Sequence, residues 1–310
     1  MPLTASLECA EVLRKIMSLF NLKEKLLQLR ELLSEFGDVV VCFSGGVDSS
    51  FLLAESVNVL GNRAVGLTAT SPSLAPEEGA AAAALAKQLG ARHILIETLE
   101  LDDPRYALNP VNRCYFCKSE VYSKAVTKAQ QLGIVNVLDG FNADDRSDYR
   151  PGFQASREQG VRSPLNELDF TKADIREAAR RLELPVWNKP ALACLSSRFP
   201  YGTTITPKRL TQVATCEKIL RDLGFSVNRV RYYHTTARIE VEPNEIQRLK
   251  NPTIQLKIAE LFQAAGFKKI VVDPRGYRRG SLNLMKPQIP MVTTLPETIP
   301  LLERSVENLD

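Results

Sequence analysis

The chain has 310 residues and a net charge of +4, and its 44% hydrophobic and 25% charged content is typical of soluble globular proteins. This composition excludes collagen-like and disordered chains, and no apolar run approaches the roughly 20 residues that span a bilayer. Charged side chains interrupt residues 1–20, unlike a secretory signal. We therefore expect a cytoplasmic protein without a membrane partner.

Apolar side chains recur at steps of three and four residues over residues 8–36, and this periodicity predicts one or two amphipathic helices. Farther along, short apolar runs alternate with helical patterns. The predicted strands are Val39–Phe43, Ala64–Thr70, His93–Glu97 and Val135–Asp139, and the predicted helices are Ser49–Leu60, Pro76–Leu89, Asn112–Leu132 and Lys172–Leu182. Such alternation predicts an α/β fold with a doubly wound parallel sheet.

A proline-rich connector, Pro185–Pro207, marks a domain boundary. Beyond it the patterns predict a helix, two strands, a helix and a strand. These are Pro207–Leu223, Val227–Tyr233, Thr236–Val241, Asn244–Ala265 and Lys268–Val272. That order predicts a smaller α+β domain. We expect N-terminal helices over residues 1–36, a main domain over 37–200 and the smaller domain, for substrate binding and oligomerisation, over 201–310.

The charge of the chain is concentrated in its last third. Residues 198–279 contain 16 basic and 7 acidic side chains. A basic module of this kind suits ligands that carry phosphate, whether a small nucleotide or an RNA. A solvated charged face is the alternative.

The segment Ser44–Ser49 reads SGGVDS and lies between a buried strand and a helix start, where backbone N–H groups and the helix dipole favour anions. It is neither a Walker loop nor a dinucleotide fingerprint, and a tight turn with two glycines is the alternative. The segment resembles the PP-loop of the ATP pyrophosphatases, which have a HUP-like fold and cleave ATP to AMP and pyrophosphate. That resemblance implies that Ser44, Gly45, Gly46, Asp48 and Ser49 bind the pyrophosphate end of ATP, and that Asp48 also binds Mg²⁺.

Two other strand ends should lie near this loop, because ligands of doubly wound sheets bind at the carboxyl ends of the strands. Thr68 and Thr70 end the second strand, and we expect them to help recognise adenosine unless they simply terminate the strand. A polar loop follows the fourth strand. It supplies the candidate ligands Asp139, Asn142, Asp144 and Asp145.

Six cysteines in a cytoplasmic chain indicate buried, catalytic or metal-binding thiols rather than disulfides. Those that lie in helical or strand patterns and fit structural roles are Cys9, Cys42 and Cys216. Cys114 and Cys117 form a C-x-x-C motif, and Cys194 stands in an irregular segment. Three thiolates leave a zinc site one ligand short but suit a 4Fe-4S cluster whose fourth iron stays open. A redox-active C-x-x-C pair is the alternative.

Four segments together indicate one family, namely SGGVDS, NRCYFCK, DGFNADDRSDYRPG and ACLSSRFPYGTTIT. They resemble the LarE family, ATP-dependent sulfur transferases that help to build the nickel-pincer nucleotide of lactate racemase. The resemblance runs from about residue 20 to Asn283. It implies that the chain adenylates the carboxylates of pyridinium-3,5-biscarboxylic acid mononucleotide and converts them to thiocarboxylates, with release of AMP and pyrophosphate. It also implies a homo-oligomer.

This family contains two types that differ in their cysteines. Single-cysteine members sacrifice the sulfur of the cysteine that corresponds to Cys194, whereas three-cysteine members use a 4Fe-4S cluster that delivers sulfide bound at its open iron. Cys114 and Cys117 match the second type. The resemblance therefore implies a cluster on Cys114, Cys117 and Cys194, and it leaves the source of the sulfide open.

Charged residues near and beyond the connector are the remaining candidates. Arg198 follows Cys194 by four residues and is assigned, with Ser197, to the catalytic site, where its guanidinium can neutralise phosphate or carboxylate charge. An exposed loop arginine is the alternative. Arg229 and Arg231 are two residues apart and project from one strand face. The predicted ligands of the substrate's phosphate and carboxylates are Arg229, Arg231, Glu240 and Arg275.

Three other interpretations stay open. A PP-loop tRNA thiolase with a 4Fe-4S cluster fits the loop, the cysteines and the basic last third. The sequence has neither zinc-ribbon pairs nor a long basic arm, so nucleic acid is not an expected partner. An amide-forming synthetase would need an ammonia source. A nucleotide-sensing or iron–sulfur binding module would bind ATP without releasing pyrophosphate.

Overall fold

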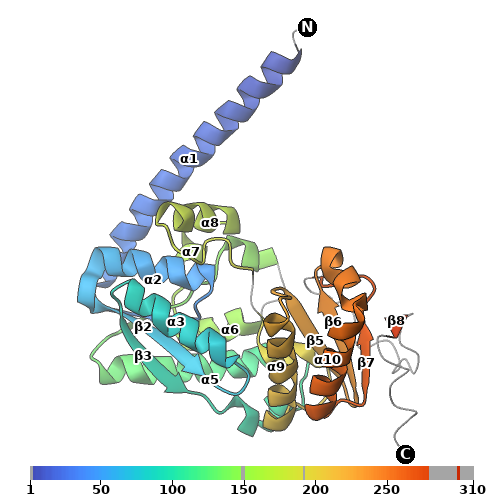
Figure 1. Ribbon diagram of the computed structural model, residues 1–310. Helices are drawn as coiled ribbons and strands as arrows, with labels where there is room; N and C mark the ends of the chain where they lie inside the picture. The colour runs from blue at the N-terminus through green and yellow to red at the C-terminus, as the bar shows by residue number, and fades with distance from the viewer. Residues whose placement is uncertain (1–2, 148–150, 191–192, 279–298, 301–310) are drawn as a thin grey trace, which may run out of the picture. The chain divides into compact units, whose positions relative to one another are not determined.

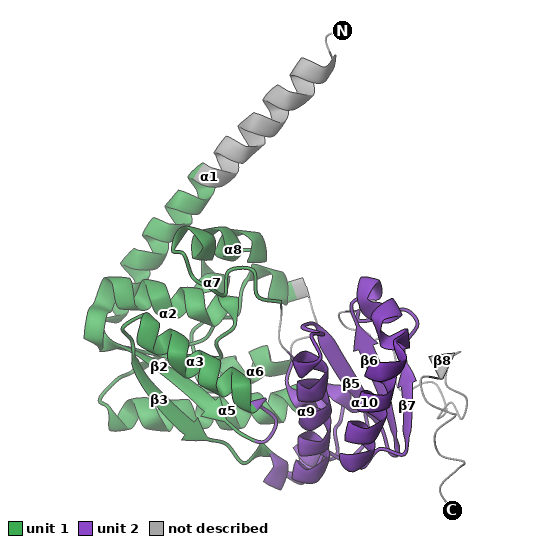
Figure 2. Cartoon of the chain, in the orientation of Figure 1, with its two compact units in different colours: residues 1–71, 76–100, 112–192 green, residues 72–75, 101–111, 193–310 purple. Residues whose placement is uncertain are grey.

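The structure, a computed structural model, describes residues 3–147, 151–190, 193–278 and 299–300, with side chains from Phe20 to Arg278 within these ranges except that of Ser147. The chain divides into two compact units, drawn in two colours in Figure 2. Unit 1 comprises residues 1–71, 76–100 and 112–192, and unit 2 comprises residues 72–75, 101–111 and 193–310. Unit 2 is therefore assembled from three separate stretches of the chain.

Unit 1 is built on a parallel four-stranded sheet in the order β3-β2-β1-β4. Its strands are β1 Val39–Cys42, β2 Ala64–Thr70, β3 Arg92–Glu97 and β4 Asn136–Leu138. Its longer helices after α1 are α2 Val47–Leu60, α3 Pro76–Gln88, α5 Arg113–Gln131, α6 Pro151–Glu158 and α8 Lys172–Arg181 (Figure 1). The chain runs from β1 through β2 to β3 and then places β4 on the other side of β1. The predicted doubly wound α/β fold is thus confirmed.

Strand β1 is buried on both faces because helices cover the sheet on each side. Val39 and Val41 pack in one core with Phe51 of α2. Val40 points to the opposite face and packs in a second core with Tyr122 of α5. This double burial explains why the strand is an unbroken apolar run in the sequence.

Helix α1, Leu3–Phe36, is one continuous helix, because no Gly or Pro interrupts it before Gly37. Its last turns pack on the rest of unit 1. The side chains of Leu29 and Leu33 are fully buried, and Arg30 donates two hydrogen bonds to Glu55 of α2 at 2.8 and 3.1 Å. Leu27, on another side of the helix, is 51% exposed.

Short helical turns connect the larger elements. They are η1 Gly61–Arg63, η2 Glu100–Asp102, α4 Pro104–Ala107, η3 Ala143–Ser147 and α7 Pro164–Glu167, where η denotes a 3₁₀ helix. Among the helices of the described residues, none combines the length and the apolar character that crossing a membrane requires.

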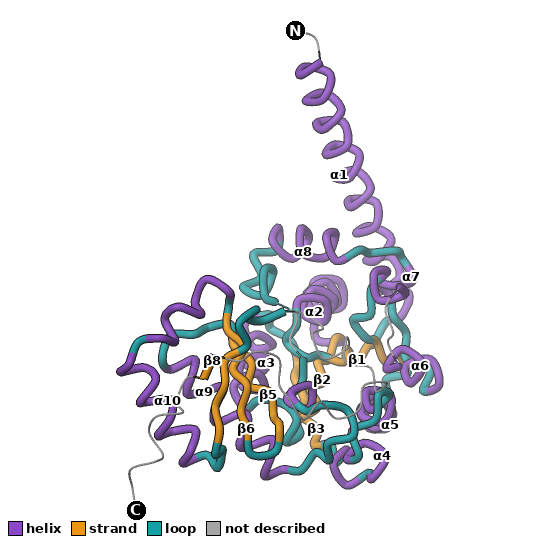
Figure 3. The backbone as a smooth tube through the Cα atoms, turned by 90° about the vertical axis from the view of Figure 1, so that its right-hand side faces the viewer, coloured by secondary structure: helices purple, strands orange, loops and turns teal. Residues whose placement is uncertain are grey.

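Unit 2 contains a second sheet in the order β5-β6-β7-β8. Its elements in residues 193–310 are η4 Leu195–Arg198, α9 Pro207–Asp222, β5 Asn228–Tyr233, β6 Thr236–Val241, η5 Pro243–Lys250, α10 Pro252–Ala264, β7 Lys269–Val272 and β8 Ile299–Pro300. Strands β5 and β6 are antiparallel, and β6 and β7 are parallel. Figure 3 shows α9 and α10 on one side of these strands. The smaller α+β domain is confirmed.

One predicted element of unit 2 is wrong. The expected helix Asn244–Ala265 is two helices, η5 and α10, which meet at Asn251. Asn251 has extended backbone angles, and its side chain accepts hydrogen bonds from the N–H groups of Thr253 and Ile254 at 3.0 and 3.3 Å. Pro252 has no N–H to continue the first helix, so a new helix begins there.

We expect Leu33→Ala to lower the free energy of unfolding by about 2–5 kcal/mol, because the removed atoms would leave a cavity between α1 and the rest of unit 1. Leu27→Ala is the matched control on the exposed side of the same helix and should cost less than about 1 kcal/mol. Urea denaturation of the two variants measures both values. Equal costs would contradict the docking of α1.

Candidate active site

The segment Ser44–Ser49, called the phosphate loop below, joins the end of β1 to the start of α2, where the strand order of the sheet reverses. Serine hydroxyls hold it in shape. Ser49 Oγ accepts a hydrogen bond from the Ser44 N–H at 3.2 Å and donates one to the Gly46 carbonyl at 3.2 Å. Gly46 is the N-cap of α2 and supplies no side-chain cap. The first N–H groups of α2 can therefore bind an anion.

Two glycines bring neighbouring backbone close to the phosphate loop. Gly45 has a φ of 70°, and a Cβ placed on it would lie 3.1 Å from Ala82 Cβ of α3. A Cβ placed on Gly140, in the turn after β4, would come within 2.9 Å of the Ser49 backbone nitrogen. Side chains at either position would displace the loop. The phosphate loop is thus confined between α3 and the turn after β4.

Asp48 meets side chains from two other elements. Lys172, at the start of α8, forms an ion pair with Asp48 Oδ2. The buried Asn142 places its Nδ2 3.5 Å from Asp48 Oδ1. The structure therefore brings together Asp48 and Asn142, two of the residues that the sequence assigned to one site.

Two predicted carboxylates bind backbone N–H groups around this site. Asp145 Oδ2 accepts a hydrogen bond from the Asn142 N–H at 3.2 Å, and Asp144 Oδ2 accepts one from the Lys172 N–H at 2.8 Å. Asn142 Oδ1 in turn accepts from the Asp144 N–H at 3.0 Å. These bonds order the loop that carries Asn142 and the start of the helix that carries Lys172.

Asp139 is buried beneath the same loop and is bound by the protein. Its carboxylate accepts hydrogen bonds from Tyr122 Oη at 3.0 Å, Ser156 Oγ at 2.6 Å and Ser163 Oγ at 2.7 Å. Burial raises the pKa of Asp139, while the two serine hydroxyls favour its charged form. The geometry makes Asp139 an anchor of the loop after β4.

The threonines at the end of β2 fasten adjacent strands. Thr68 Oγ1 donates to the Phe43 carbonyl at 2.6 Å, immediately before the phosphate loop, and lies 2.8 Å from His93 Nε2. Thr70 Oγ1 donates to the Ile96 carbonyl at 3.1 Å. The side-chain hydroxyls are thus occupied, and an adenosine at this edge would meet the strand backbone.

Sequence reasoning missed two lysines at the phosphate loop. Lys172 pairs with Asp48, and Lys189 Nζ lies 2.8 Å from Glu78 Oε2 of α3 and 3.4 Å from the Gly45 carbonyl oxygen. Lys172 begins a helix and Lys189 stands in an irregular connector, so neither belongs to a periodic pattern. The match to the phosphate loop carried no information on residues so distant in sequence.

The C-x-x-C pair opens helix α5 of unit 1. Cys114 is exposed and Cys117 is partly buried, and their spacing of three residues places them on one side of the helix. By contrast, burial raises the pKa of the Cys42 thiol to about 12, and it also raises the pKa of Cys216. The structural assignment of Cys42 and Cys216 agrees with these inert environments.

Cys194 belongs to unit 2, where it is exposed and stands at the N-cap position of the short helix η4 without a side-chain capping bond. Among the described residues, no group of three or more His, Cys, Asp and Glu side chains is arranged to hold a metal ion. A cluster on Cys114, Cys117 and Cys194 therefore stays a prediction.

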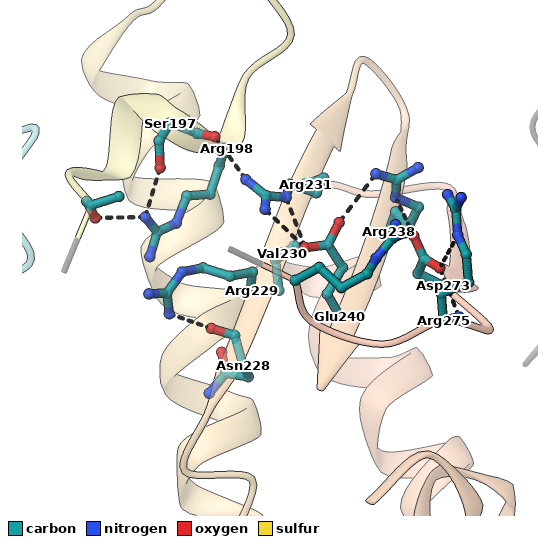
Figure 4. A network of polar contacts seen from close by, with 12 residues as sticks. Ser197, Arg198, Asn228, Arg229, Val230, Arg231, Arg238, Glu240, Asp273 and Arg275 are labelled. Carbon is teal, nitrogen blue, oxygen red and sulfur yellow. Dashed lines mark hydrogen bonds and ion pairs between the residues drawn. The ribbon is translucent and has the colours of Figure 1, made fainter. Parts of the chain in front are cut away.

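Arg198 fixes the backbone around Cys194 (Figure 4). Its Nε and Nη2 form a bidentate ion pair with Glu217 at 2.8 and 2.9 Å. Its Nη1 donates to the carbonyl oxygens of Ala193 and Cys194 at 2.7 and 3.0 Å, and to Ser197 Oγ at 3.0 Å. Both Arg198 and Glu217 are buried. The guanidinium thus binds protein groups on all three nitrogens.

A chain of alternating charges crosses one face of the second sheet (Figure 4). Arg231 Nε donates to Glu240 Oε2 at 3.0 Å, and Arg238 Nη2 donates to Glu240 Oε1 at 3.1 Å. Asp273 Oδ2 lies 3.8 Å from Arg238 Nε, and Asp273 Oδ1 lies 3.6 Å from Arg275 Nε. Four of the five side chains are buried, and Arg275 is 55% exposed.

Arg229 lies on the same strand face as Arg231, as the sequence predicted, but the two differ in their partners. Arg231 Nη1 donates to the Ser197 carbonyl at 2.8 Å in addition to its pairing within the charge chain. Arg229 stacks on the Tyr277 ring at 5.0 Å, and no described carboxylate pairs with it. Burial and the nearby charge of Arg198 lower the pKa of Arg229. This cation is therefore disposed to bind an anion.

Comparisons with known proteins identify the family. No protein-family model matches the chain. An uncharacterized protein of Synechocystis is 45% identical to it over 262 residues, which cover 84% of this chain and 98% of that protein. The pyridinium-3,5-bisthiocarboxylic acid mononucleotide synthase of Lactiplantibacillus plantarum is 39% identical to it over 253 residues, which cover 81% of this chain and 91% of that protein. The chain belongs to the LarE family.

The resemblance to the LarE family that the four sequence segments indicated is thus confirmed, and the three-cysteine type stays a prediction. Among solved structures, the NMN synthetase of Francisella tularensis matches 55% of this LarE-family chain and 75% of its own, with 19% identity and a TM-score of 0.46. Some positions predicted from the sequence lie outside the described residues. They are residues 148–150, 191–192 and 279–283, and the side chain of Cys9.

We expect Glu217→Gln to lower the free energy of unfolding by about 3–5 kcal/mol at neutral pH, because Arg198 would lose its charged partner in a buried site. Burial alone would raise the pKa of Glu217, but Arg198 holds it below its ordinary value of 4.5. The contribution is present above that value and is lost as the pH falls through the lowered pKa. Denaturant unfolding at neutral and acidic pH measures it.

Glu177→Gln is the control on an exposed ion pair. Hydrogen bonds from Arg180 and Arg181 lower the pKa of Glu177 to about 2, but its side chain is 34% exposed. Solvent screening should leave a cost below about 1 kcal/mol. Similar costs for Glu217→Gln and Glu177→Gln would contradict the role given to the buried pair.

Proposed function

We propose that the chain is an ATP-dependent sulfurtransferase that converts both carboxylates of pyridinium-3,5-biscarboxylic acid mononucleotide to thiocarboxylates, for the nickel-pincer nucleotide of lactate racemase. One observation carries the proposal: a phosphate loop of PP-loop sequence at the switch point of the sheet, in a chain 39% identical to a synthase of the bisthiocarboxylic acid mononucleotide. The proposed site of action is the cytoplasm.

The phosphate loop would bind the pyrophosphate end of ATP. Its backbone N–H groups and the positive end of the α2 dipole favour the phosphates, and the small residues Gly45 and Gly46 allow close approach. Asp48 would hold Mg²⁺ through its carboxylate oxygens, which are ligands of the kind that this ion prefers. In the structure these oxygens contact Lys172 Nζ and the Asn142 amide nitrogen. When bound, the ion would neutralise charge on the phosphates. Adenosine would lie against the ends of β1 and β2.

The reaction activates a poor acyl donor. A carboxylate oxygen of the substrate attacks the α-phosphorus of ATP, and pyrophosphate leaves with the electron pair of the broken P–O bond. A sulfur nucleophile then attacks the acyl carbon, and AMP leaves with the original carboxylate oxygen. The N–H groups of the phosphate loop stabilise the charge that develops on the departing pyrophosphate.

Three thiolates would hold the proposed 4Fe-4S cluster. The chemistry of the donors supports this proposal, because soft cysteine sulfurs bind such clusters. Cys114 and Cys117 lie on one side of a helix, and Cys114 and Cys194 are exposed. When bound, a cluster with three protein ligands supplies an open iron that can hold sulfide.

The residues of unit 2 divide between positioning and binding. Arg198 positions Cys194, because its donors already engage the backbone and Glu217. Ser197 belongs to the same arrangement through its hydroxyl and carbonyl. Arg229, which no described carboxylate pairs with, would bind the substrate's phosphate or a carboxylate. The remaining proposed ligands are Arg231, Glu240 and Arg275.

We expect pyrophosphate release that depends on the dicarboxylate mononucleotide, accompanied by replacement of oxygen by sulfur when sulfide is present. Asp48→Asn should lower the rate of release at least about 100-fold, because it weakens the stabilisation of the leaving phosphates. Asp222→Asn, at an exposed ion pair of unit 2, is the control and should keep wild-type activity. Anaerobic assays of pyrophosphate with mass spectrometry of the product measure both. Release stimulated by tRNA instead would favour the thiolase.

Iron and acid-labile sulfide measurements test the cluster separately. After anaerobic reconstitution we expect about four irons per wild-type chain and their loss in Cys114→Ala, Cys117→Ala and Cys194→Ala. Cys216→Ala, which changes a buried structural thiol, should retain the iron. A wild-type chain without iron, and with the mass of H₂S lost from Cys194 after turnover, would instead show a sacrificial sulfur donor.

A further inference from the structure

Lys189 brings a positive charge to the phosphate loop from outside the loop. It lies in the connector after α8 and reaches the phosphate loop, where its Nζ is 3.4 Å from the Gly45 carbonyl oxygen. The same ammonium lies 2.8 Å from Glu78 Oε2 of α3, and the two side chains are 22% and 24% exposed. Lys189 is therefore a partly hydrated cation in contact with the phosphate loop.

The loop does not depend on this ion pair for its shape. The left-handed conformation of Gly45 and its close contact with Ala82 already fix the loop against α3. The hydroxyls of Ser44 and Ser49 fix it from within. A partly exposed lysine–carboxylate pair contributes little to stability. The ion pair between Lys189 and Glu78 is thus weak enough for the lysine to exchange partners.

An ammonium at this position suits the phosphate chain of a nucleotide. Lysine carries a compact charge on a flexible stem, so Nζ can move several ångströms without any backbone movement. Phosphates carry more negative charge than the single carboxylate of Glu78, and hydrogen bonds between charged groups are strong. The anion that binds the N-terminus of α2 would lie beside Gly45 and within reach of Nζ.

We propose that Lys189 binds the phosphate chain of the nucleotide and that Glu78 holds it in readiness when the site is empty. This inference rests on the proposed function only in requiring a nucleotide at the phosphate loop. It adds a phosphate-binding residue outside the loop and a carboxylate that competes with the nucleotide for it.

Lys189 can be tested more cleanly than Lys172. Lys172 pairs with Asp48, the proposed Mg²⁺ ligand, so changes at Lys172 also disturb that carboxylate. Glu78 has no place in the proposed metal site. The pair of Lys189 and Glu78 can therefore be changed on either side without altering Asp48.

Isothermal titration of the full chain with Mg·ATP, pyrophosphate and AMP tests the inference. We expect Lys189→Ala to weaken the binding of ATP and pyrophosphate about 10- to 100-fold and to leave AMP binding nearly unchanged. Glu78→Gln should leave ATP binding unchanged or tighten it, because the lysine is no longer held by a carboxylate. Lys218→Ala, at an exposed pair in unit 2, is the control.

Comparison of Lys189→Ala with Glu78→Gln shows whether Lys189 binds phosphate or only ties the loop to α3. If Lys189 only ties the loop to α3, Glu78→Gln will weaken ATP binding as much as Lys189→Ala does, and the inference is wrong. Unchanged ATP binding by Lys189→Ala also overturns it. Melting temperatures of the ligand-free variants show whether either substitution disturbs the fold.

The outcome is distinguishable from that of the proposed function. A wild-type chain that binds ATP in a Lys189-dependent manner but makes no thiocarboxylate would retain this inference and reject the sulfurtransferase. If the wild-type chain makes thiocarboxylate and Lys189→Ala binds ATP as the wild type does, the sulfurtransferase is retained and this inference is rejected. A wild-type chain that binds neither ATP nor pyrophosphate would reject both.

Discussion

Backbone contact without intervening side chains holds the phosphate loop in place. Gly45 lies against Ala82, and Gly140 lies against the backbone of Ser49, so the loop cannot shift toward α3 or toward the turn after β4. Asp48 meets Asn142 and Lys172 because the start of α2 has only one position available. A rigid loop is suited to binding phosphate, since its N–H groups need no reorganisation.

Unit 2 relies on charge rather than on close backbone contact. Burial of Arg198, Arg231 and Arg238 is tolerable only because Glu217, Glu240 and Asp273 lie beside them. Pairs of this kind are poor sources of net stability, but they fix directions. The Arg198 guanidinium binds the carbonyl groups that precede and follow the Cys194 Cα, and Cys194 is exposed. The buried arginines Arg198 and Arg231 thus fix the backbone around Cys194 and Ser197.

Much of this architecture was predictable. Doubly buried strands such as β1 are unbroken apolar runs, and a phosphate loop between a strand and a helix has its own sequence pattern. Asn251 and Pro252 are residues that typically start a new helix, but the apolar periodicity continues across them, so a single helix was predicted. The pairs of Lys172 with Asp48 and Lys189 with Glu78 could not be predicted from the sequence. Their members are 124 and 111 residues apart, and only the wound sheet brings them together.

The division of unit 2 into three stretches bears on how the chain is made. Tyr106 Oη lies 2.6 Å from Ser196 Oγ, and Asn109 Nδ2 donates to the Pro200 carbonyl at 2.8 Å. Residues 101–111 leave the ribosome well before those partners are synthesised, so this stretch must wait, incompletely paired, within a growing chain. A fragment that starts at Ala193 would lack it altogether. The second unit is therefore unsuited to transfer as an independent module, and gene fusions or truncations have to preserve the whole chain order.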